Sequence, residues 1–100
     1  MSKIYLKIHG EGTPNIVVGA CDEECLGQTY KEGQYCFKVT DAFYHGVLLN
    51  VNDAIKILKS VPNFNAVGKT LIAALVAQEI IHSEGTLTIQ GVPIAMRFLL

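Results

Sequence analysis

The chain has 100 residues, of which half are hydrophobic and 17% are charged, and its formal net charge is −1. This composition excludes intrinsic disorder, which requires too little apolar surface to offset chain entropy, and the length leaves no room for a second domain. Eight basic against nine acidic residues provide no positive field for generic binding to a nucleic-acid backbone. We therefore expect one globular α+β domain over residues 1–100, with a mostly antiparallel or mixed sheet packed against two main helices.

The N-terminal third predicts a β-hairpin followed by a short helix. Ile4, Leu6 and Ile8 alternate with polar residues, which is the period of a strand with one apolar face. A loop rich in turn formers then leads to a second apolar run at 16–20. Asp22 is placed to cap a short helix that Gly27 ends, because an N-cap oxygen accepts an otherwise unpaired backbone N–H.

Later strands follow from the same alternation. They are predicted at 35–39, 47–49, 86–89 and 92–99, with turns at Gly33, Gly85 and Gly91. The segment 40–46 predicts a helical turn or a tight loop. Pro93 confines the last strand to an edge or places the proline at the strand's start, because proline has no N–H to donate.

Two longer helices are predicted, one from Asn52 or Asn50 to about Lys59 and one from Asn65 or Asn63 to about Ile81. Pro62 stops the first. The second is apolar around most of its circumference, so it lies either between the sheet and the first helix or against a second copy of the chain. A homodimer on this helix or on an exposed strand edge is therefore one expectation.

Cysteine usage and hydropathy bear on the compartment. Three cysteines are an odd number, and the N-terminus alternates instead of running through an apolar signal-peptide core, so we expect a cytoplasmic location and free thiols. The most apolar stretch, 66–81, is interrupted by Lys69 and Glu79 and is shorter than a membrane span. No membrane association is expected.

Cys21 and Cys25 are four residues apart, a spacing at which two thiols on a helix share one face. Two ligands do not make a closed metal site, so we predict no metal and no cofactor. A thiol before a helix N-terminus is a candidate nucleophile, yet the three carboxylates after Cys21 oppose thiolate formation. The residues do not decide whether the protein is an enzyme; we favour a non-catalytic protein with no catalytic residues.

Gly68-Lys69-Thr70 has the last three residues of a phosphate-binding loop. The first glycine of that motif is absent, because Asn63 occupies its position, and the preceding element is predicted as a helix where the motif needs a strand. We interpret Lys69 as a residue on the exposed side of a helix.

Phe43-Tyr44-His45-Gly46 combines aromatic rings with a titratable imidazole. Such a segment contributes to a ligand-binding surface in some proteins and packs as a buried loop in others. The histidines lie in unrelated segments and indicate no catalytic triad.

Four segments together resemble the archaeal domain-of-unknown-function family 424. Residues 20–27 resemble its alanine-cysteine-aspartate-glutamate-glutamate-leucine-leucine-glycine segment, with Cys25 in place of a leucine. Residues 43–46, 65–68 and 91–93 resemble its phenylalanine-tyrosine-glycine-glycine turn, its asparagine-leucine-valine-glycine helix start and its glycine-valine-proline turn. Ile94 stands where the family often has histidine, which argues against a mechanism that needs an imidazole there. The resemblance implies no established activity and suggests an association with translation.

Our first hypothesis is a non-catalytic binding or accessory module, associated with the translation or RNA-handling machinery and binding a protein more readily than bare RNA. Its expected binding residues are Cys21, Asp22, Glu23, Gly27, Phe43, Tyr44, Asn65, Gly68, Gly91 and Pro93. The alternative is a small cysteine-dependent enzyme or redox protein with Cys21 as nucleophile and His45 or Asp22 as its helper.

Overall fold

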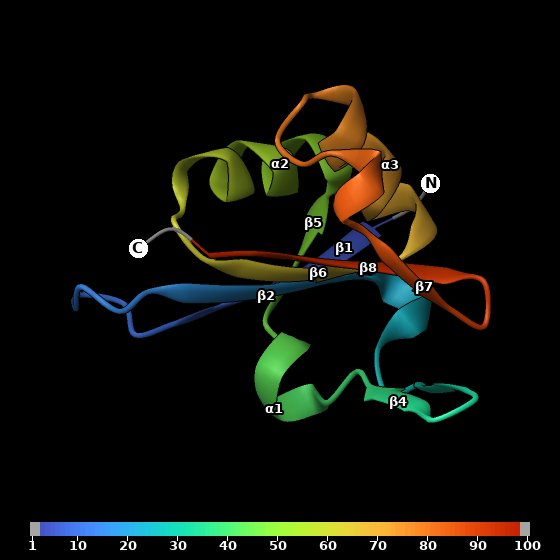
Figure 1. Ribbon diagram of the computed structural model, residues 1–100. Coiled ribbons are helices and arrows are strands. Elements are labelled where there is room, and N and C mark those ends of the chain that lie inside the picture. The colour runs from blue at the N-terminus through green and yellow to red at the C-terminus, as the bar shows by residue number, and fades with distance from the viewer. Residues whose placement is uncertain (1–2, 99–100) are drawn as a thin grey trace.

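A mixed six-stranded sheet with the strand order β5-β1-β2-β6-β8-β7 forms the centre of the molecule (Figure 1). The computed structural model describes residues 3–98. Its strands are β1 Lys3–His9, β2 Val17–Asp22, β3 Thr29–Glu32, β4 Tyr35–Lys38, β5 Val47–Asn50, β6 Phe64–Val67, β7 Leu87–Ile89 and β8 Val92–Arg97. Its helices are α1 Asp41–Tyr44, α2 Val51–Ser60 and α3 Lys69–Ala77, with the 3₁₀ turns η1 Glu23–Cys25 and η2 Ser83–Gly85. The α+β expectation is confirmed.

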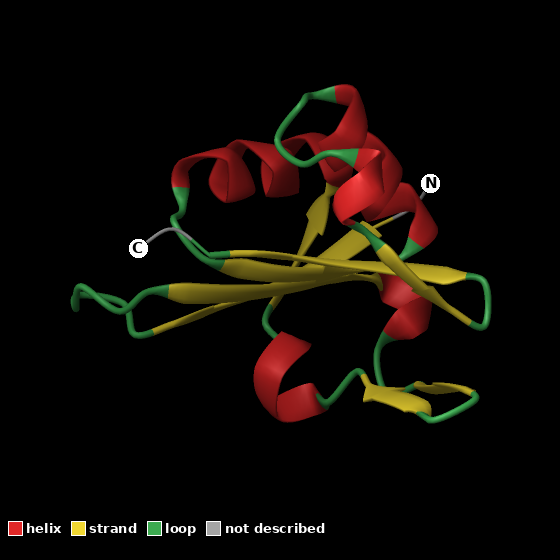
Figure 2. Ribbon diagram, viewed as in Figure 1, coloured by secondary structure: helices red, strands yellow, loops and turns green. Residues whose placement is uncertain are grey.

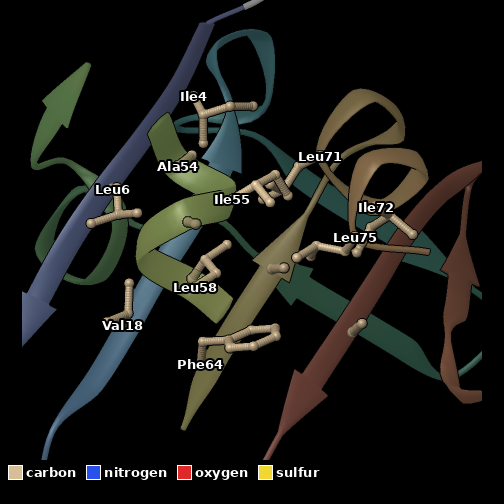
Figure 3. Close-up of a cluster of buried hydrophobic side chains, with 13 residues drawn as sticks. Ile4, Leu6, Val18, Ala54, Ile55, Leu58, Phe64, Leu71, Ile72 and Leu75 are labelled. Carbon is tan, nitrogen blue, oxygen red and sulfur yellow. The ribbon is translucent and has the colours of Figure 1, made fainter. Parts of the chain in front are cut away.

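One face of the large sheet carries the main hydrophobic core beneath α2 and α3 (Figure 3). The predicted alternation holds here, because Ile4 and Leu6 of β1 point to this face together with Val18 of β2. The helices contribute Ala54, Ile55, Leu58, Leu71, Ile72 and Leu75 to the same cluster. The two main helices and the sheet therefore form two layers, as the sequence predicts.

The opposite face is covered by smaller elements, namely η1, α1 and the separate two-stranded sheet of β3 and β4 (Figure 2). A second apolar cluster fills the space between them and the large sheet; its buried members are Cys21, Cys25, Val39, Tyr44, Val67, Ile89 and Ile94. We call this side of the large sheet the second face. The two cysteines of the 20–27 segment are thus core residues of the second face.

Strand β6 is the largest departure from the sequence prediction, which assigned residues 64–67 to the start of a helix. The strand pairs with β2 in parallel and with β8 in antiparallel orientation, at the centre of the sheet. A four-residue strand with buried residues on both faces is too short to show a strand period, so the pattern alone does not separate it from a buried helix. The prediction that Asn65 or Asn63 caps the helix is therefore wrong.

Helix α3 ends at Ala77, four residues before the predicted end. Glu79 adopts a left-handed conformation with φ 58°, its N–H donates to the Val76 carbonyl, and the Ile80 N–H donates to the Leu75 carbonyl at 2.9 Å. This pair of bonds is a Schellman motif, in which glycine is the usual residue at the left-handed position. Without that glycine the sequence carries no stop signal. Within residues 3–98 no helix is long and apolar enough to cross a membrane.

Three smaller features concern a helix cap, a proline and a strand. Asn50, one of two predicted caps, begins α2 by accepting a hydrogen bond from the Asp53 N–H at 2.8 Å. Strand β8 is interior, with β6 on one side and β7 on the other, so Pro93 marks a strand start and not a sheet edge. Strand β3 was not predicted, because its sequence, Thr-Tyr-Lys-Glu, has no apolar alternation.

Candidate functional site

The parallel strands β2 and β6 end at the same edge of the sheet. Strand β2 continues into η1, and β6 continues through Gly68 into α3. The carboxyl ends of parallel strands and the N-terminus of a following helix are where crevices form in sheets of this kind. Three segments that are far apart in the sequence meet at this edge: 21–25, 67–71 and 91–93.

Asp22 caps a helix, but not the one predicted from the sequence. Its carboxylate accepts hydrogen bonds from the backbone N–H groups of Thr70 and Leu71, each at 2.9 Å, which are amides in the first turn of α3. Its side chain makes no capping bond to η1, the short helix that follows it in sequence. Because Asp22 is fully buried, these two bonds place a negative charge at the positive end of the α3 dipole without exposing it to solvent.

Gly68 makes this close approach between the two segments sterically feasible. Its φ of 118° lies in the region that favours glycine, and a Cβ atom built there would overlap the carboxyl group of Asp22. The Gly68 N–H donates to the carbonyl of Pro93 at 3.0 Å, which ties the start of β8 to the same place. Asp22, Gly68 and Pro93 therefore lie together in one cluster, in which Asp22 is hydrogen-bonded to the first turn of α3 and Gly68 to Pro93.

A pocket of about 200 Å³ opens beside this cluster. Its lining residues are Asp22, Glu24, Cys25, Tyr30, Lys69 and Val92. Two carboxylates and one ammonium group give the lining an excess of negative charge, and the phenol ring of Tyr30 adds an aromatic wall. Glu24 and Lys69 are exposed to solvent, whereas Asp22 is committed to α3.

Burial governs the titration of the acidic groups in this region. It raises the pKa of Asp22 above its usual value, an effect that outweighs the two backbone hydrogen bonds and is reinforced by Glu24. Burial, together with the nearby Cys25, Asp22 and Glu24, raises the pKa of the Cys21 thiol to about 12. The pKa of Cys25 is raised as well, again mainly by burial. Both thiols are thus protonated at neutral pH, the opposite of what a thiolate nucleophile requires.

The glycine-lysine-threonine segment follows a strand, β6, where the sequence predicts a helix. The element before Gly68 is therefore of the type that a phosphate-binding loop requires. The geometry nevertheless disfavours phosphate, since the Asp22 carboxylate already occupies the amides of Thr70 and Leu71. A phosphate at this helix N-terminus would meet that buried carboxylate.

The family model described as "Protein of unknown function (DUF424)" matches residues 11–100. The chain belongs to this family. A solved structure of an uncharacterized conserved protein from Methanopyrus kandleri has a similar fold, with a TM-score of 0.81 and 23% sequence identity over 98% of this chain and 92% of that chain. No curated protein matches the chain.

Three of the four segments that carry the resemblance to DUF424 meet at the pocket edge. Segment 20–27 contributes Asp22, segment 65–68 contributes Gly68 and segment 91–93 contributes Pro93. Of the other predicted binding residues, Cys21 lies buried beside Asp22 and Glu23 begins η1. Gly27 and Gly91 adopt positive φ angles of 80° and 78°, in the loop after η1 and in the β7–β8 turn.

The aromatic segment 43–46 lies on the second face and contributes no side chain to the pocket lining. The Phe43 ring stacks on His9 with 4.6 Å between ring centroids, and the Phe43 carbonyl lies 2.9 Å from His9 Nε2. Tyr44 is buried in the second apolar cluster. These contacts are those of a packed loop whose aromatic side chains contact one another.

Asn65, another predicted binding residue, is in the middle of β6, where its Oδ1 atom is buried without a hydrogen-bond partner.

Of the pocket-lining residues only Asp22 is among the expected binding residues; the others are Glu24, Cys25, Tyr30, Lys69 and Val92. Glu24 and Lys69 carried a signal, since both were noted for other reasons, whereas Tyr30 lies on the strand that was not predicted. Within residues 3–98 no group of three or more histidine, cysteine, aspartate or glutamate side chains is arranged to hold a metal ion.

Proposed function

We propose that the protein is a non-catalytic binding module that takes a protein partner at the pocket beside Asp22. The observation that carries the proposal is the convergence of three distant segments on one pocket, with hydrogen bonds that join Asp22 to the start of α3 and Gly68 to Pro93. Binding sites are commonly built from loops held by a rigid scaffold, and this pocket has that construction.

The lining favours a basic side chain of the partner. Glu24 supplies an exposed carboxylate, Asp22 adds negative charge from below, and the Tyr30 ring offers a face on which a cation is attracted. The ammonium group of Lys69 offsets part of this negative charge and is available to an acidic side chain of the partner. With a net charge of −1 for the whole chain, the same surface gives a phosphate backbone little attraction.

Affinity capture from lysate of the source organism, with and without ribonuclease, tests this proposal. We expect a protein partner that persists after ribonuclease and is lost from the Glu24→Lys variant. Glu84→Lys is the matched control, because it makes the same charge change in the exposed turn η2, away from the pocket. A partner released by ribonuclease, or one retained equally by both variants, would contradict binding at this pocket.

The translation or RNA-handling association belongs to this proposal as well. Recovery of ribosomal proteins or initiation factors in the ribonuclease-resistant fraction would support it, and recovery of unrelated partners would remove it. A cytoplasmic location is also part of the proposal, supported by three cysteines that are all free, as in a reducing compartment. No observation favours the alternative of a Cys21 enzyme, because that thiol is buried and protonated. Self-association is proposed beside the partner, with an exposed strand edge as its surface.

A further inference from the structure

The last part of strand β8 has one uncovered edge. Strand β7 pairs with β8 only as far as Leu87 opposite Ile94, whereas β8 continues to Arg97. Before Leu87 the chain forms the turn η2, and Figure 1 shows β8 running on past the start of β7. The stretch 95–97 therefore pairs with β6 on one side, and no strand within residues 3–98 pairs with it on the other.

The backbone of Met96 faces this uncovered edge. The Pro93 carbonyl accepts a hydrogen bond from the Gly68 N–H, so it points to the β6 side of the strand. The peptide groups of successive residues in a strand point alternately to its two sides, so positions 95 and 97 also face β6. The N–H and C=O of Met96 point outward, and unpaired groups of this kind at a sheet edge are a template for an added strand.

Two hollows flank this edge, one on each face of the sheet, and both are lined by Ala95 and Met96. The second-face hollow has a volume of about 350 Å³ and apolar walls that include Phe37, Leu87 and Ile94. The core-face hollow, on the side of the main core, has a volume of about 340 Å³ and is lined in part by Ile80, Ile81, His82 and Arg97. Successive side chains of an added strand point alternately to the two faces, and so to the two hollows.

Arg97 gives the core-face hollow a positive charge without a counter-ion. Its Cζ atom lies 6.0 Å from the centroid of the Phe64 ring, and it forms no ion pair with any residue from 3 to 98. His82 lines the same hollow, and no described carboxylate lines either one. A carboxylate accepts strong, charge-assisted hydrogen bonds from a guanidinium group, so this hollow is complementary to an acidic side chain.

We propose that an extended segment of a partner protein adds to β8 at this edge, antiparallel to β8 and with the pattern apolar–acidic–apolar. The acidic side chain lies opposite Arg97 in the core-face hollow, and the apolar side chains on either side of it point to the second-face hollow. The antiparallel orientation continues the line of β7, whose pairing ends at Leu87. This surface is a second binding site, independent of the pocket beside Asp22.

The blocked peptide acetyl-Gly-Leu-Glu-Leu-Gly-amide, titrated to about 1 mM because short segments bind weakly, tests the strand pairing on the wild-type chain. We expect saturable changes in the NMR chemical shifts of the amides at 94–98. In the proposed pairing the two leucine N–H groups face β8 and the glutamate N–H faces away. Methylation of both leucine nitrogens should therefore weaken binding at least about tenfold, whereas methylation of the glutamate nitrogen should change it less than about twofold. No saturable shift at 94–98, or equal weakening by both methylations, would overturn the proposal.

A charge exchange tests the role of Arg97. Arg97→Glu should weaken binding of the glutamate peptide at least about tenfold and should bind the peptide with lysine in place of glutamate more tightly than the wild type does. That gain shows that the variant is folded. Lys56→Glu is the matched control, because it makes the same change at an exposed lysine of α2 that lines neither hollow. Equal effects of both substitutions would refute the contact with Arg97.

Glu24→Lys, which tests the pocket beside Asp22, should leave peptide binding unchanged. The two binding proposals therefore succeed or fail separately. Loss of the peptide from Glu24→Lys would show that the peptide occupies that pocket and would overturn binding at β8.

Discussion

Replacing Asp22 by alanine should destabilise the fold strongly, because one side chain holds the start of α3 to the end of β2. The substitution removes both acceptors and leaves the buried N–H groups of Thr70 and Leu71 without partners. A buried donor left unpaired costs about 1–3 kcal/mol. We expect the free energy of unfolding to fall by about 2–4 kcal/mol, because entering water relieves part of the cost for one of the two N–H groups. The free energy of unfolding of a small domain is about 5–15 kcal/mol, so the variant stays folded but its urea midpoint is clearly lower.

Asp22→Asn separates the charge of this cap from its shape. The amide keeps one acceptor and turns its NH₂ group toward the other backbone donor, so the expected loss is about 1–3 kcal/mol. Because the folded pKa of Asp22 is raised, the folded state holds the proton more tightly than the unfolded state. The wild-type contribution therefore falls as pH rises from the ordinary aspartate pKa through the raised one, and the gap to Asp22→Asn narrows over that window.

Urea unfolding of both variants at several pH values measures these effects, with Asp53→Asn as the matched control. Asp53 is an exposed aspartate in the first turn of α2, so its neutralisation should cost less than about 1 kcal/mol. If the free energy of unfolding of Asp22→Ala lies within about 0.5 kcal/mol of the wild type, the α3 amides find water or another acceptor, and the capping argument is refuted. A gap to Asp22→Asn that widens with pH would refute the direction of the pKa shift.

Three further predictions follow from backbone geometry and burial. Gly68→Ala should cost more than about 2 kcal/mol in thermal unfolding, because its Cβ meets a buried carboxyl group, while Gly33→Ala, with a φ of 60° and open space, should cost less. Glu79→Gly should stabilise the chain by up to about 1 kcal/mol in the same assay, since it removes a left-handed glutamate from the end of α3; a loss would contradict this. Native alkylation followed by mass spectrometry at neutral pH should label the exposed Cys36 rapidly and Cys21 slowly, because the Cys21 thiol is buried and its pKa is raised. Rapid labelling of Cys21 would revive the enzyme alternative.

The sequence predicts those elements whose signals are local. The alternation of Ile4, Leu6 and Ile8 identifies β1 because one face of that strand is buried under α2 and the other is not. Asn50 is identified as a cap because its bond is to an amide three residues away. Strand β6 was not recognised because it has only four residues: Phe64 and Ala66 are buried on one face and Val67 on the other, and the single polar residue Asn65 is too little to establish a period.

The sequence does not predict the candidate site for a related reason: the contacts that build the site join residues far apart in the chain. Asp22 has the sequence context of a local cap, with acidic residues after it, and the residues alone do not show that its acceptors serve a helix 48 positions later. The family-like segments nevertheless marked the right neighbourhood, because Asp22 packs against Gly68, and the Gly68 N–H is hydrogen-bonded to the Pro93 carbonyl. What no pattern marked is Tyr30, which reaches the pocket from an unpredicted strand.

The geometry separates two roles that the sequence merges in segment 20–27. Both oxygens of Asp22 are engaged by α3, so this residue has little left to offer a partner, and its loss should lower stability and binding together. Glu24 is exposed on the same pocket with no such commitment, so its loss should lower binding at unchanged stability. Measuring both quantities for both variants distinguishes a site that binds from a site that only holds the fold together. If Glu24→Lys keeps its stability and its partner, the convergence of the three segments is purely structural, and the partner surface lies elsewhere.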